Sequence, residues 1–255
     1  MVIVLPCPQN LQTESHSDDM SKREQQRKVK EQKQKAAQQR EQTKKLMAKF
    51  ALFVIAPVFL LIVAYTLYSQ GPIYSPIEIA DNDHVRGTTA TPVSIVVYAD
   101  FQCPACAQEN QTMSRIWPTV RDKAHLVFRH YPITTSHPHA WTASLYAEAA
   151  GQQGRFWEMH DYLFANQAVW STIGEPELEF ESYAQELNLD LDKLRSDIET
   201  DLVVQKVRND QRGGNSSGVR STPTIFINGT MVARPTANRI VELVESAFAE
   251  SNTAG

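Results

Sequence analysis

Cysteine is scarce in this sequence: its 255 residues include three, Cys7, Cys103 and Cys106. Structural zinc usually takes four Cys or His ligands, often as two spaced pairs. With a single cysteine pair, such a site would need histidines, and the one close pair is His137 and His139, on either side of a proline. We interpret that pair as part of a surface loop. The scarcity of cysteine therefore argues against a structural zinc site, and we predict no metal.

Charge is missing from Phe50 to Tyr68, a run of nineteen mostly apolar residues. As a helix this run spans about 28 Å, close to the hydrocarbon thickness of a bilayer. Pro57 is compatible with that role, because membrane helices accept proline better than soluble ones do. The run is longer than the apolar part of a typical signal peptide, and a poor cleavage site follows it. We therefore predict an uncleaved, single-pass transmembrane anchor over residues 50–68.

Basic residues are also missing just beyond this anchor, where the first one is Arg86. Residues 1–49 hold 11 Lys and Arg against 6 Asp and Glu, whereas residues 71–255 hold 14 against 23. The positive-inside rule therefore places the N-terminus in the cytoplasm and the large C-terminal part across the cytoplasmic (inner) membrane. That part would lie in the periplasm or another extracytoplasmic space, where disulfides persist.

The N-terminal residues 1–49 lack the features of a folded or nucleic-acid-binding module. Between Ser21 and Lys45 almost no apolar position could form a coiled-coil seam. Neither aromatic residues nor a motif supports nucleic-acid binding. We interpret these residues as a basic, polar cytoplasmic arm with no nucleic-acid partner. A translation start at Met20 is an open alternative, and it would remove Cys7.

The tetrad Cys103-Pro104-Ala105-Cys106 directly follows an apolar run that is typical of a buried strand. If a helix begins here, Cys103 lies at its N-terminus, where free N–H groups and the helix dipole favour a thiolate. Pro104 suits the first helical turn, because its missing donor has no intrahelical partner there. Cys106 lies three residues on, close enough to attack a disulfide formed at Cys103. The pattern favours thiol redox chemistry, with metal binding as the alternative.

The rest of the chain predicts a tether over residues 69–84 and one globular domain over residues 85–250. Asn228-Gly229 between two apolar runs predicts a hairpin, and the glycines and serines of 213–218 predict a loop before it. Strands are expected at Val93–Tyr98, His125–Arg129, Thr224–Ile227 and Thr230–Ala233. Helices are expected at Ala140–Ala150, Arg155–Gln167, Glu179–Leu187, Leu191–Thr200, Leu202–Gln211 and Thr236–Phe248, the last capped by Thr236.

Four motifs in this order resemble the DsbA-like thiol:disulfide oxidoreductases. The resemblance covers residues 84–250 and implies an α/β, thioredoxin-like fold with an inserted helical domain at about 134–215, here preceded by a single transmembrane helix. The motifs are Asp100-Phe101-Gln102-Cys103-Pro104-Ala105-Cys106, Val127-Phe128-Arg129-His130-Tyr131-Pro132, Gly154-Arg155-Phe156-Trp157-Glu158-Met159-His160 and Ser221-Thr222-Pro223-Thr224-Ile225-Phe226-Ile227-Asn228-Gly229.

The resemblance also implies the roles of the site residues. Pro223 would be a cis-proline facing the dithiol, with the Thr222 backbone exposed to pair with a substrate peptide. Cys103 would be the exposed nucleophile and Cys106 its shielded partner, with Pro104 and Ala105 as the active-site dipeptide. The redox-active disulfide would take the place of a cofactor. The implied partners are exported proteins with free thiols or disulfides and a membrane redox partner that recycles the dithiol.

Two positions depart from the family pattern. Strongly oxidising relatives often have a histidine where Ala105 stands, and many thioredoxin-like proteins have a buried acidic residue where Val97 stands. Asp100 is the nearest carboxylate, and its role is open between proton transfer and a turn at the strand end. The expected function is a membrane-anchored oxidase that introduces disulfides into exported proteins. A reductase or isomerase, and a metal-handling chaperone that binds Cu(I) through both thiols, are the alternatives.

Overall fold

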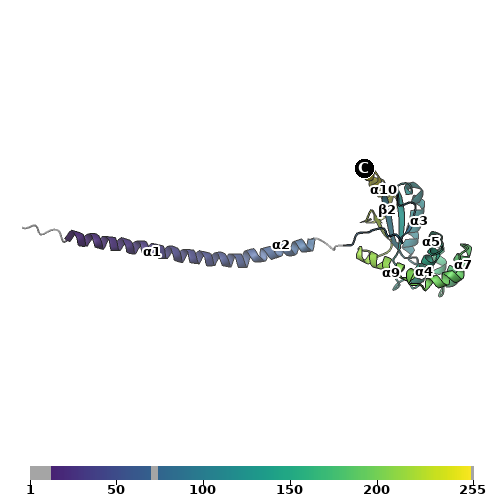
Figure 1. The fold of residues 1–255 in the computed structure, drawn as a ribbon, viewed down its shortest axis with the longest axis horizontal. Helices are drawn as coiled ribbons and strands as arrows, with labels where there is room; N and C mark the ends of the chain where they lie inside the picture. Colours follow the sequence, from purple (N-terminus) through teal and green to yellow (C-terminus); the bar gives the residue numbers. More distant parts are fainter. Residues whose placement is uncertain (1–12, 70–73, 254–255) are drawn as a thin grey trace, which may run out of the picture. The chain divides into compact units, whose positions relative to one another are not determined.

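The computed structural model describes residues 13–69 and 74–253, so Cys7 and residues 70–73 of the expected tether lie outside the described residues. The chain divides into an N-terminal helical unit, which ends at Ile73, and a globular unit, which begins at Tyr74 (Figure 1).

The helical unit consists of α1 (Thr13–Phe50), a π-helical turn η1 (Ala51–Ile55) and α2 (Ala56–Ser69). Pro57 has no N–H to continue the regular helical bonding, and the backbone is wound more loosely just before it. Instead of the usual partner four residues back, the Ala56 N–H bonds the carbonyl of Ala51.

One helix in the described part of the chain is long and apolar enough to cross a membrane. It covers Arg27–Val63 and contains an eighteen-residue window with a mean hydropathy of 2.6, none of it buried. The apolar side chains from Leu52 to Ile62 are exposed in the isolated chain. Such a surface is suited to a lipid environment, which agrees with the span expected from the sequence.

The globular unit is built on a five-stranded mixed sheet in the order β1-β3-β2-β4-β5. The central strand β2 pairs parallel with β3 and antiparallel with β4, and both edge strands pair antiparallel with their neighbours. The strands are β1 (His84–Arg86), β2 (Val93–Ala99), β3 (Ala124–His130), β4 (Thr224–Ile227) and β5 (Thr230–Met231).

Helices cover both faces of this sheet, so β2 is buried along almost its whole length. On one face α3 (Pro104–Val120) and α10 (Ala237–Thr253) pack on alternate residues of β2 such as Ile95 and Val97. On the other face Val96 and Tyr98 pack against residues that include Val219. The β2–α3–β3 unit is a crossover between two parallel strands, which places the start of α3 at the carboxyl end of β2.

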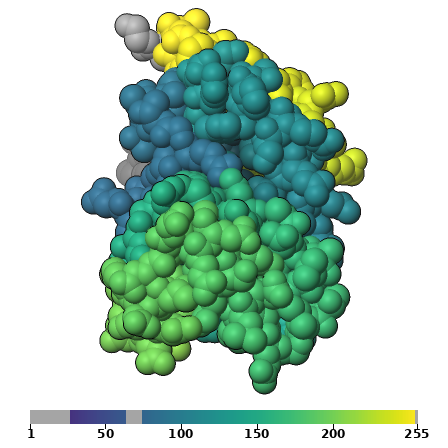
Figure 2. Space-filling view, turned by 90° about the vertical axis from the view of Figure 1, so that its right-hand side faces the viewer, coloured from purple at the N-terminus to yellow at the C-terminus, as the bar shows by residue number. Residues whose placement is uncertain are grey.

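The segment between β3 and β4 forms a helical block. Its elements are α4 (Ala140–Gly151), α5 (Phe156–Ala165), α6 (Gln167–Trp170), α7 (Glu177–Glu186), α8 (Leu191–Ile198) and α9 (Asp201–Ser216). The block gathers beyond one end of the sheet (Figure 1) and makes up the green part of the surface in Figure 2. The fold is therefore the expected one, thioredoxin-like with an inserted helical domain.

The globular unit begins earlier than the sequence suggested. Residues expected to be tether pack on it: the Ser75 N–H bonds the carbonyl of Ser216, and Arg129 bonds both the Asp83 carboxylate and the carbonyl of Glu78. The short strand β1, which the sequence analysis did not predict, follows directly. The tether of 69–84 is thus shorter than expected, because a segment without an apolar pattern of its own is held by hydrogen bonds to distant residues.

The expected loop over 213–218 is also corrected. Helix α9 continues through both glycines to Ser216, and a Cβ at Gly214 would lie 2.9–3.0 Å from the rings of Tyr131 and Tyr98. A glycine at this position lets the helix approach the sheet closely. The turn consists of Ser217 and Gly218, and the φ of +88° at Gly218 is the left-handed conformation that commonly ends a helix.

The C-terminal part follows the expected pattern. Asn228 and Gly229 both have positive φ and connect β4 to β5. The second strand of this hairpin is shorter than the expected Thr230–Ala233. The Thr236 hydroxyl accepts a hydrogen bond from the Arg239 N–H at the start of α10, which is the predicted N-cap.

Candidate functional site

The dithiol lies at the junction of β2 and α3. Cys103 is the N-cap of α3, with φ −74° and ψ 120°, and Pro104 occupies the first helical turn. The carbonyl of Cys103 accepts hydrogen bonds from the N–H groups of Cys106 and Ala107, at 3.0 and 3.2 Å. The Cys103 side chain is therefore held where the free N–H groups of the helix end converge.

The two sulfurs differ in environment, although neither forms a disulfide and both cysteines are largely buried. Cys103 is 7% exposed and Cys106 is 1% exposed, so Cys103 is less open than the term exposed nucleophile implied. Hydrogen bonds from the Cys106 thiol, from Thr222 and from the N–H groups of Ala105 and Cys106 lower the pKa of Cys103 to about 5. A group with this pKa is a thiolate at neutral pH.

The pKa of Cys106 moves the other way. Burial raises it first of all, because the charged form loses its hydration, and the neighbouring Cys103 raises it further. The nearest backbone donor is the N–H of Asp100, at 3.5 Å from the Cys106 sulfur. Cys106 is therefore a neutral thiol at physiological pH, and it can act as a nucleophile only if its proton is removed.

The turn before β4 faces this dithiol. The Thr222–Pro223 peptide bond is cis, and the carbonyl of Thr222 lies 3.7 Å from the Cys103 sulfur, which donates to it as a thiol. The Thr222 hydroxyl oxygen is buried and forms no hydrogen bond with the described residues while Cys103 is a thiol. Once Cys103 is a thiolate, this hydroxyl can donate to it, which is how Thr222 contributes to the lowered pKa of Cys103. The fold thus brings all four motif residues, Cys103, Cys106, Thr222 and Pro223, to one place.

Asp100 is the carboxylate whose role the sequence left open. It is fully buried and accepts hydrogen bonds from the N–H groups of Gln102 and Ile133, at 2.7 and 2.8 Å. Its second oxygen also bonds Nδ1 of His137 at 2.8 Å. These contacts fix the strand end and the loop after β3, so the structure favours the turn role. His137, expected in a surface loop, is part of this arrangement.

Glutamine side chains from two segments join the dithiol loop to the helical block. Nε2 of Gln167 donates to the carbonyls of Phe101 and Cys103, at 2.6 and 2.9 Å. Oε1 of Gln102 accepts from the N–H of His139 at the start of α4. These roles could not be predicted from the sequence, because a glutamine carries no local signal for a partner that lies 37 to 66 residues away.

Glu109 is a further site residue that was not predicted from the sequence. It lies on α3, and it lines a cavity together with Cys106, Val97 and Pro223. Val97, the strand position at which the family resemblance leads us to expect an acidic residue, is apolar, and the carboxylate of this cavity belongs to helix α3. The spacing of three residues after Cys106 could have indicated this, since such residues share a helix face.

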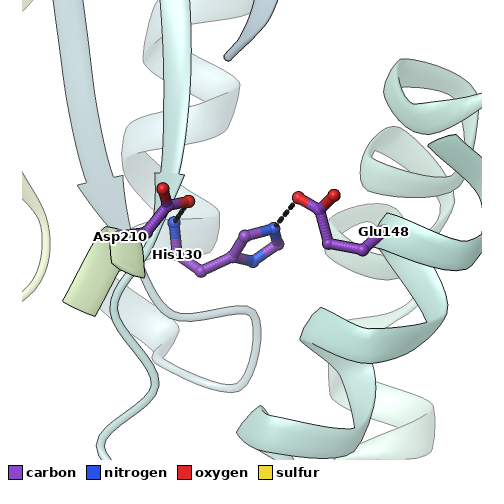
Figure 3. Close-up of side chains that lie close together, drawn as sticks. All are labelled: His130, Glu148 and Asp210. Atoms are coloured by element: carbon purple, nitrogen blue, oxygen red, sulfur yellow. Dashed lines mark hydrogen bonds and ion pairs between the residues drawn. The ribbon is translucent and has the colours of Figure 1, made fainter. Parts of the chain in front are cut away.

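A second cluster of buried polar side chains lies away from the dithiol, between β3, α4 and α9. Glu148 accepts hydrogen bonds from Nε2 of His130 at 2.7 Å and from Nε2 of His84 at 2.9 Å. On the other side of His130, its backbone N–H donates a hydrogen bond to the carboxylate of Asp210 at 3.0 Å (Figure 3). Lys206 forms an ion pair with Asp210 at 2.7 Å.

The donor atoms of His130, Glu148 and Asp210 lie within 4.8 Å of one another, close enough for a metal ion. The chemistry of the set fits an ion-pair network better. Both carboxylates already have cationic or N–H partners, and the Lys206 ammonium occupies the charge-compensating position at Asp210. Burial alone would raise the pKa of Glu148, but the hydrogen bonds from His130 and His84 lower it far below its usual range. We interpret the cluster as structural.

Comparisons with known proteins agree with this geometry. A family model described as thioredoxin matches residues 80–246, more than half of the chain. Curated relatives named Na(+)/H(+) antiporter NhaA include one from Salinispora arenicola, 41% identical over 149 residues, which cover 58% of this chain and 22% of the relative. Another, from Salinispora tropica, is 38% identical over 67% of this chain and 26% of the relative. This chain spans about a quarter of the length of these relatives, so the antiporter activity in their names is a statement about those proteins and not about this chain.

Solved structures resemble the globular unit over almost their whole length. Alpha-DsbA1 of Wolbachia pipientis has a TM-score of 0.62 at 18% identity, covering 70% of this chain and 96% of that one. BdbD of Bacillus subtilis has a TM-score of 0.61 at 20% identity, covering 69% and 98%. MdbA of Corynebacterium diphtheriae, a thiol-disulfide oxidoreductase, has a TM-score of 0.54 at 17% identity, covering 68% and 94%. This chain therefore belongs to the thioredoxin family, and its globular unit has the DsbA-like form of the fold, with a helical domain inserted.

Proposed function

We propose that this chain is a membrane-anchored thiol:disulfide oxidoreductase that forms disulfides in exported proteins. The observation that carries the proposal is the contrast between its two thiols. The pKa of Cys103 is lowered to about 5, whereas burial raises that of Cys106. Stabilising the reduced form through a Cys103 thiolate makes a dithiol pair oxidising.

The exchange has two steps. A substrate thiolate attacks the Cys103 sulfur of the Cys103–Cys106 disulfide, and the Cys106 sulfur leaves with the electron pair and takes up a proton. A second substrate thiolate then attacks the substrate sulfur of the mixed disulfide, and Cys103 leaves as a thiolate. The substrate has lost two electrons and gained a disulfide, and the enzyme is reduced. The low pKa of Cys103 assists the second step, because a more acidic thiol leaves faster.

The surroundings of the dithiol suit a peptide substrate. Pro104 and Ala105 are exposed at the start of α3, and the carbonyl of Thr222 lies beside the Cys103 sulfur. An extended peptide that reaches Cys103 would lie along the turn at Thr222–Pro223 and pair with its backbone. This proposal assigns Cys103 and Cys106 to catalysis and Thr222 and Pro223 to substrate binding.

We propose the inner membrane as the location, with residues 50–68 as the anchor, the basic arm in the cytoplasm and the globular unit outside. The support is the apolar helix together with the excess of Lys and Arg on its N-terminal side. The proposed partners are exported proteins with free thiols and a membrane protein that removes two electrons from the reduced dithiol.

The reduction potential of the full chain, measured in glutathione buffers and detergent, tests the direction of exchange. A potential near about −120 mV would support a disulfide donor, whereas one near about −270 mV would overturn the oxidase and favour a reductase. Stoichiometric Cu(I) retained by the wild type, and lost in Cys103→Ser, would instead favour the metal-handling alternative.

A further inference from the structure

The cavity behind the dithiol contains one carboxylate. The cavity has a volume of about 340 Å³, including the part that opens to solvent, and its walls are almost entirely apolar. Cys106 and Glu109 of α3 line it, together with Val97 of β2 and Pro223 of the turn before β4. The sulfur that must change its protonation state during exchange thus shares a cavity with a single acidic side chain.

Glu109 has no structural partner at its buried end. Its Oε1 atom is buried and forms no hydrogen bond with any described residue. Desolvation alone raises the pKa of Glu109 to about 7. A buried oxygen without a partner is costly to the fold, so packing gives no reason for a glutamate at this position. A carboxyl group with this pKa exchanges a proton readily at neutral pH.

The spacing of the two residues places them on one helix face. Cys106 and Glu109 are three residues apart on α3, so their Cβ atoms lie about 5–6 Å from each other. Trp157 lines the same cavity, and its Nε1 atom is buried and has no hydrogen-bond partner among the described residues. A water molecule held by Glu109 and Trp157 would extend the reach of the carboxylate to the Cys106 sulfur.

The other titratable groups near the cavity are poorly suited to this exchange. His160 of α5 also lines the cavity, but its burial lowers its pKa to about 4, and its Nδ1 is held by Asp161 at 2.8 Å. Asp100, next to Cys106, is occupied by three hydrogen bonds. The lining residues of β2 and β3 are apolar, and the turn before β4 contributes Pro223.

We propose that Glu109 is the proton donor and acceptor for Cys106, a role that rests on the proposed thiol–disulfide exchange. When a substrate thiolate breaks the Cys103–Cys106 bond, protonated Glu109 gives its proton to the departing Cys106 sulfur and becomes a carboxylate. In the reverse direction, the Glu109 carboxylate takes the proton of the Cys106 thiol as that sulfur attacks Cys103, and the substrate sulfur leaves with the electron pair.

The reverse direction gives a direct test in the full chain. Reduced protein is mixed with glutathione disulfide, and acid-quenched samples are analysed by mass for the mixed disulfide of Cys103 with glutathione. The decay of this species is the step in which Cys106 attacks. We expect Glu109→Gln to slow the decay about 100-fold at neutral pH, the lower end of what a positioned acid or base contributes. Glu109→Asp, which keeps the carboxylate, should restore part of the rate.

The pH profile separates a chemical role from a structural one. In the wild type the decay rate should rise with pH and level off above about pH 7, where Glu109 is ionised. In Glu109→Gln that inflection should disappear, while alkylation of Cys103 by iodoacetamide keeps its wild-type rate. Glu175→Gln, which removes an exposed glutamate of the helical block, is the matched control and should behave as the wild type does.

Two outcomes would overturn the inference in distinguishable ways. If Glu109→Gln resolves the mixed disulfide at the wild-type rate and with the wild-type pH profile, Glu109 is not the proton carrier, and the proposed function stands. If the wild type itself forms no mixed disulfide with glutathione, the proposed function fails, and the role of Glu109 fails with it.

Discussion

Two glutamates of the same globular unit, Glu109 and Glu148, are removed from water in part or in full, but their partners differ. Glu148 lies between two histidines that both donate to it, and its pKa falls far below the usual range. Glu109 has a buried oxygen without a partner, and its pKa rises to about 7. Burial acts in the same direction on both, so their partners decide the sign of the shift. The paired glutamate can only hold the fold together, while the unpaired one is available for chemistry.

The largest expected effect is on thiol–disulfide exchange, because this reaction takes place at the two sulfur atoms of the dithiol. Cys103→Ser should abolish exchange, because no nucleophile remains at the start of α3. Cys106→Ser should leave the first attack intact and accumulate mixed disulfides with substrate proteins, which non-reducing gel electrophoresis would reveal. Normal turnover in the Cys106 variant would contradict its role as the resolving thiol.

The next largest effect should come from a substitution of Glu148, the paired glutamate. Glu148→Gln removes one partner of a buried ion-pair network, so we expect a loss of about 3 kcal/mol in the free energy of unfolding. Because the folded pKa of Glu148 lies below its usual value of 4.5, its contribution is fully present above that pH. The difference from the wild type should therefore shrink as the pH falls below 4.5. Denaturant unfolding at several pH values measures it, and a difference that grows in acid would contradict the ion-pair interpretation.

A smaller effect is expected where the turn before β4 meets Cys103. Thr222→Val removes a hydroxyl that helps to lower the pKa of Cys103, after the larger contribution of Cys106. A hydrogen bond to a charged group is worth roughly 1.5 kcal/mol, so the pKa of Cys103 should rise by about one unit. The thiolate absorbance, followed through a pH titration, reports the change. An unchanged titration would mean that the hydroxyl does not reach the sulfur.

The smallest effect should be the change that Glu109→Gln makes in the free energy of unfolding. The folded pKa of Glu109, about 7, lies above its usual value of 4.5, so its contribution to stability is present below pH 4.5 and is lost as the pH rises to 7. The variant should match the wild type in acid and unfold at a higher denaturant concentration above pH 7. The gain is modest, because part of the side chain contacts solvent. A variant less stable than the wild type at pH 8 would mean that Glu109 has a stabilising partner.

The sequence was sufficient where the signal is local. The tetrad at Cys103, the hairpin at Asn228-Gly229 and the cap at Thr236 each depend on a few adjacent residues. The order of the motifs added the fold and the helical insertion. These features need no knowledge of which distant segments meet.

What the sequence could not supply depends on tertiary proximity. His84, His130, Glu148 and Asp210 come from four separate segments, and none of them carries a pattern that names the others. The same holds for Gln167, whose partners lie at the dithiol loop. Gly214 was predicted to be a loop residue. Its position requires a glycine because the rings of Tyr98 and Tyr131 lie close to it, and the sequence does not show which rings will lie there.

Tyr74, the first residue of the globular unit, packs on that unit, and this contact affects where a protease could release the unit from its anchor. The ring of Tyr74 lies against Gly218, where a Cβ would come within 2.8–2.9 Å of the ring, and the Arg220 guanidinium lies 6.0 Å from the centre of the same ring. Gly218 and Arg220 lead directly into the turn at Thr222. A protease that cuts before Tyr74 would release a domain with this contact intact. One that cuts among residues 75–83 would release a domain without the Tyr74 contact at Gly218, which lies four residues before Thr222 in the chain.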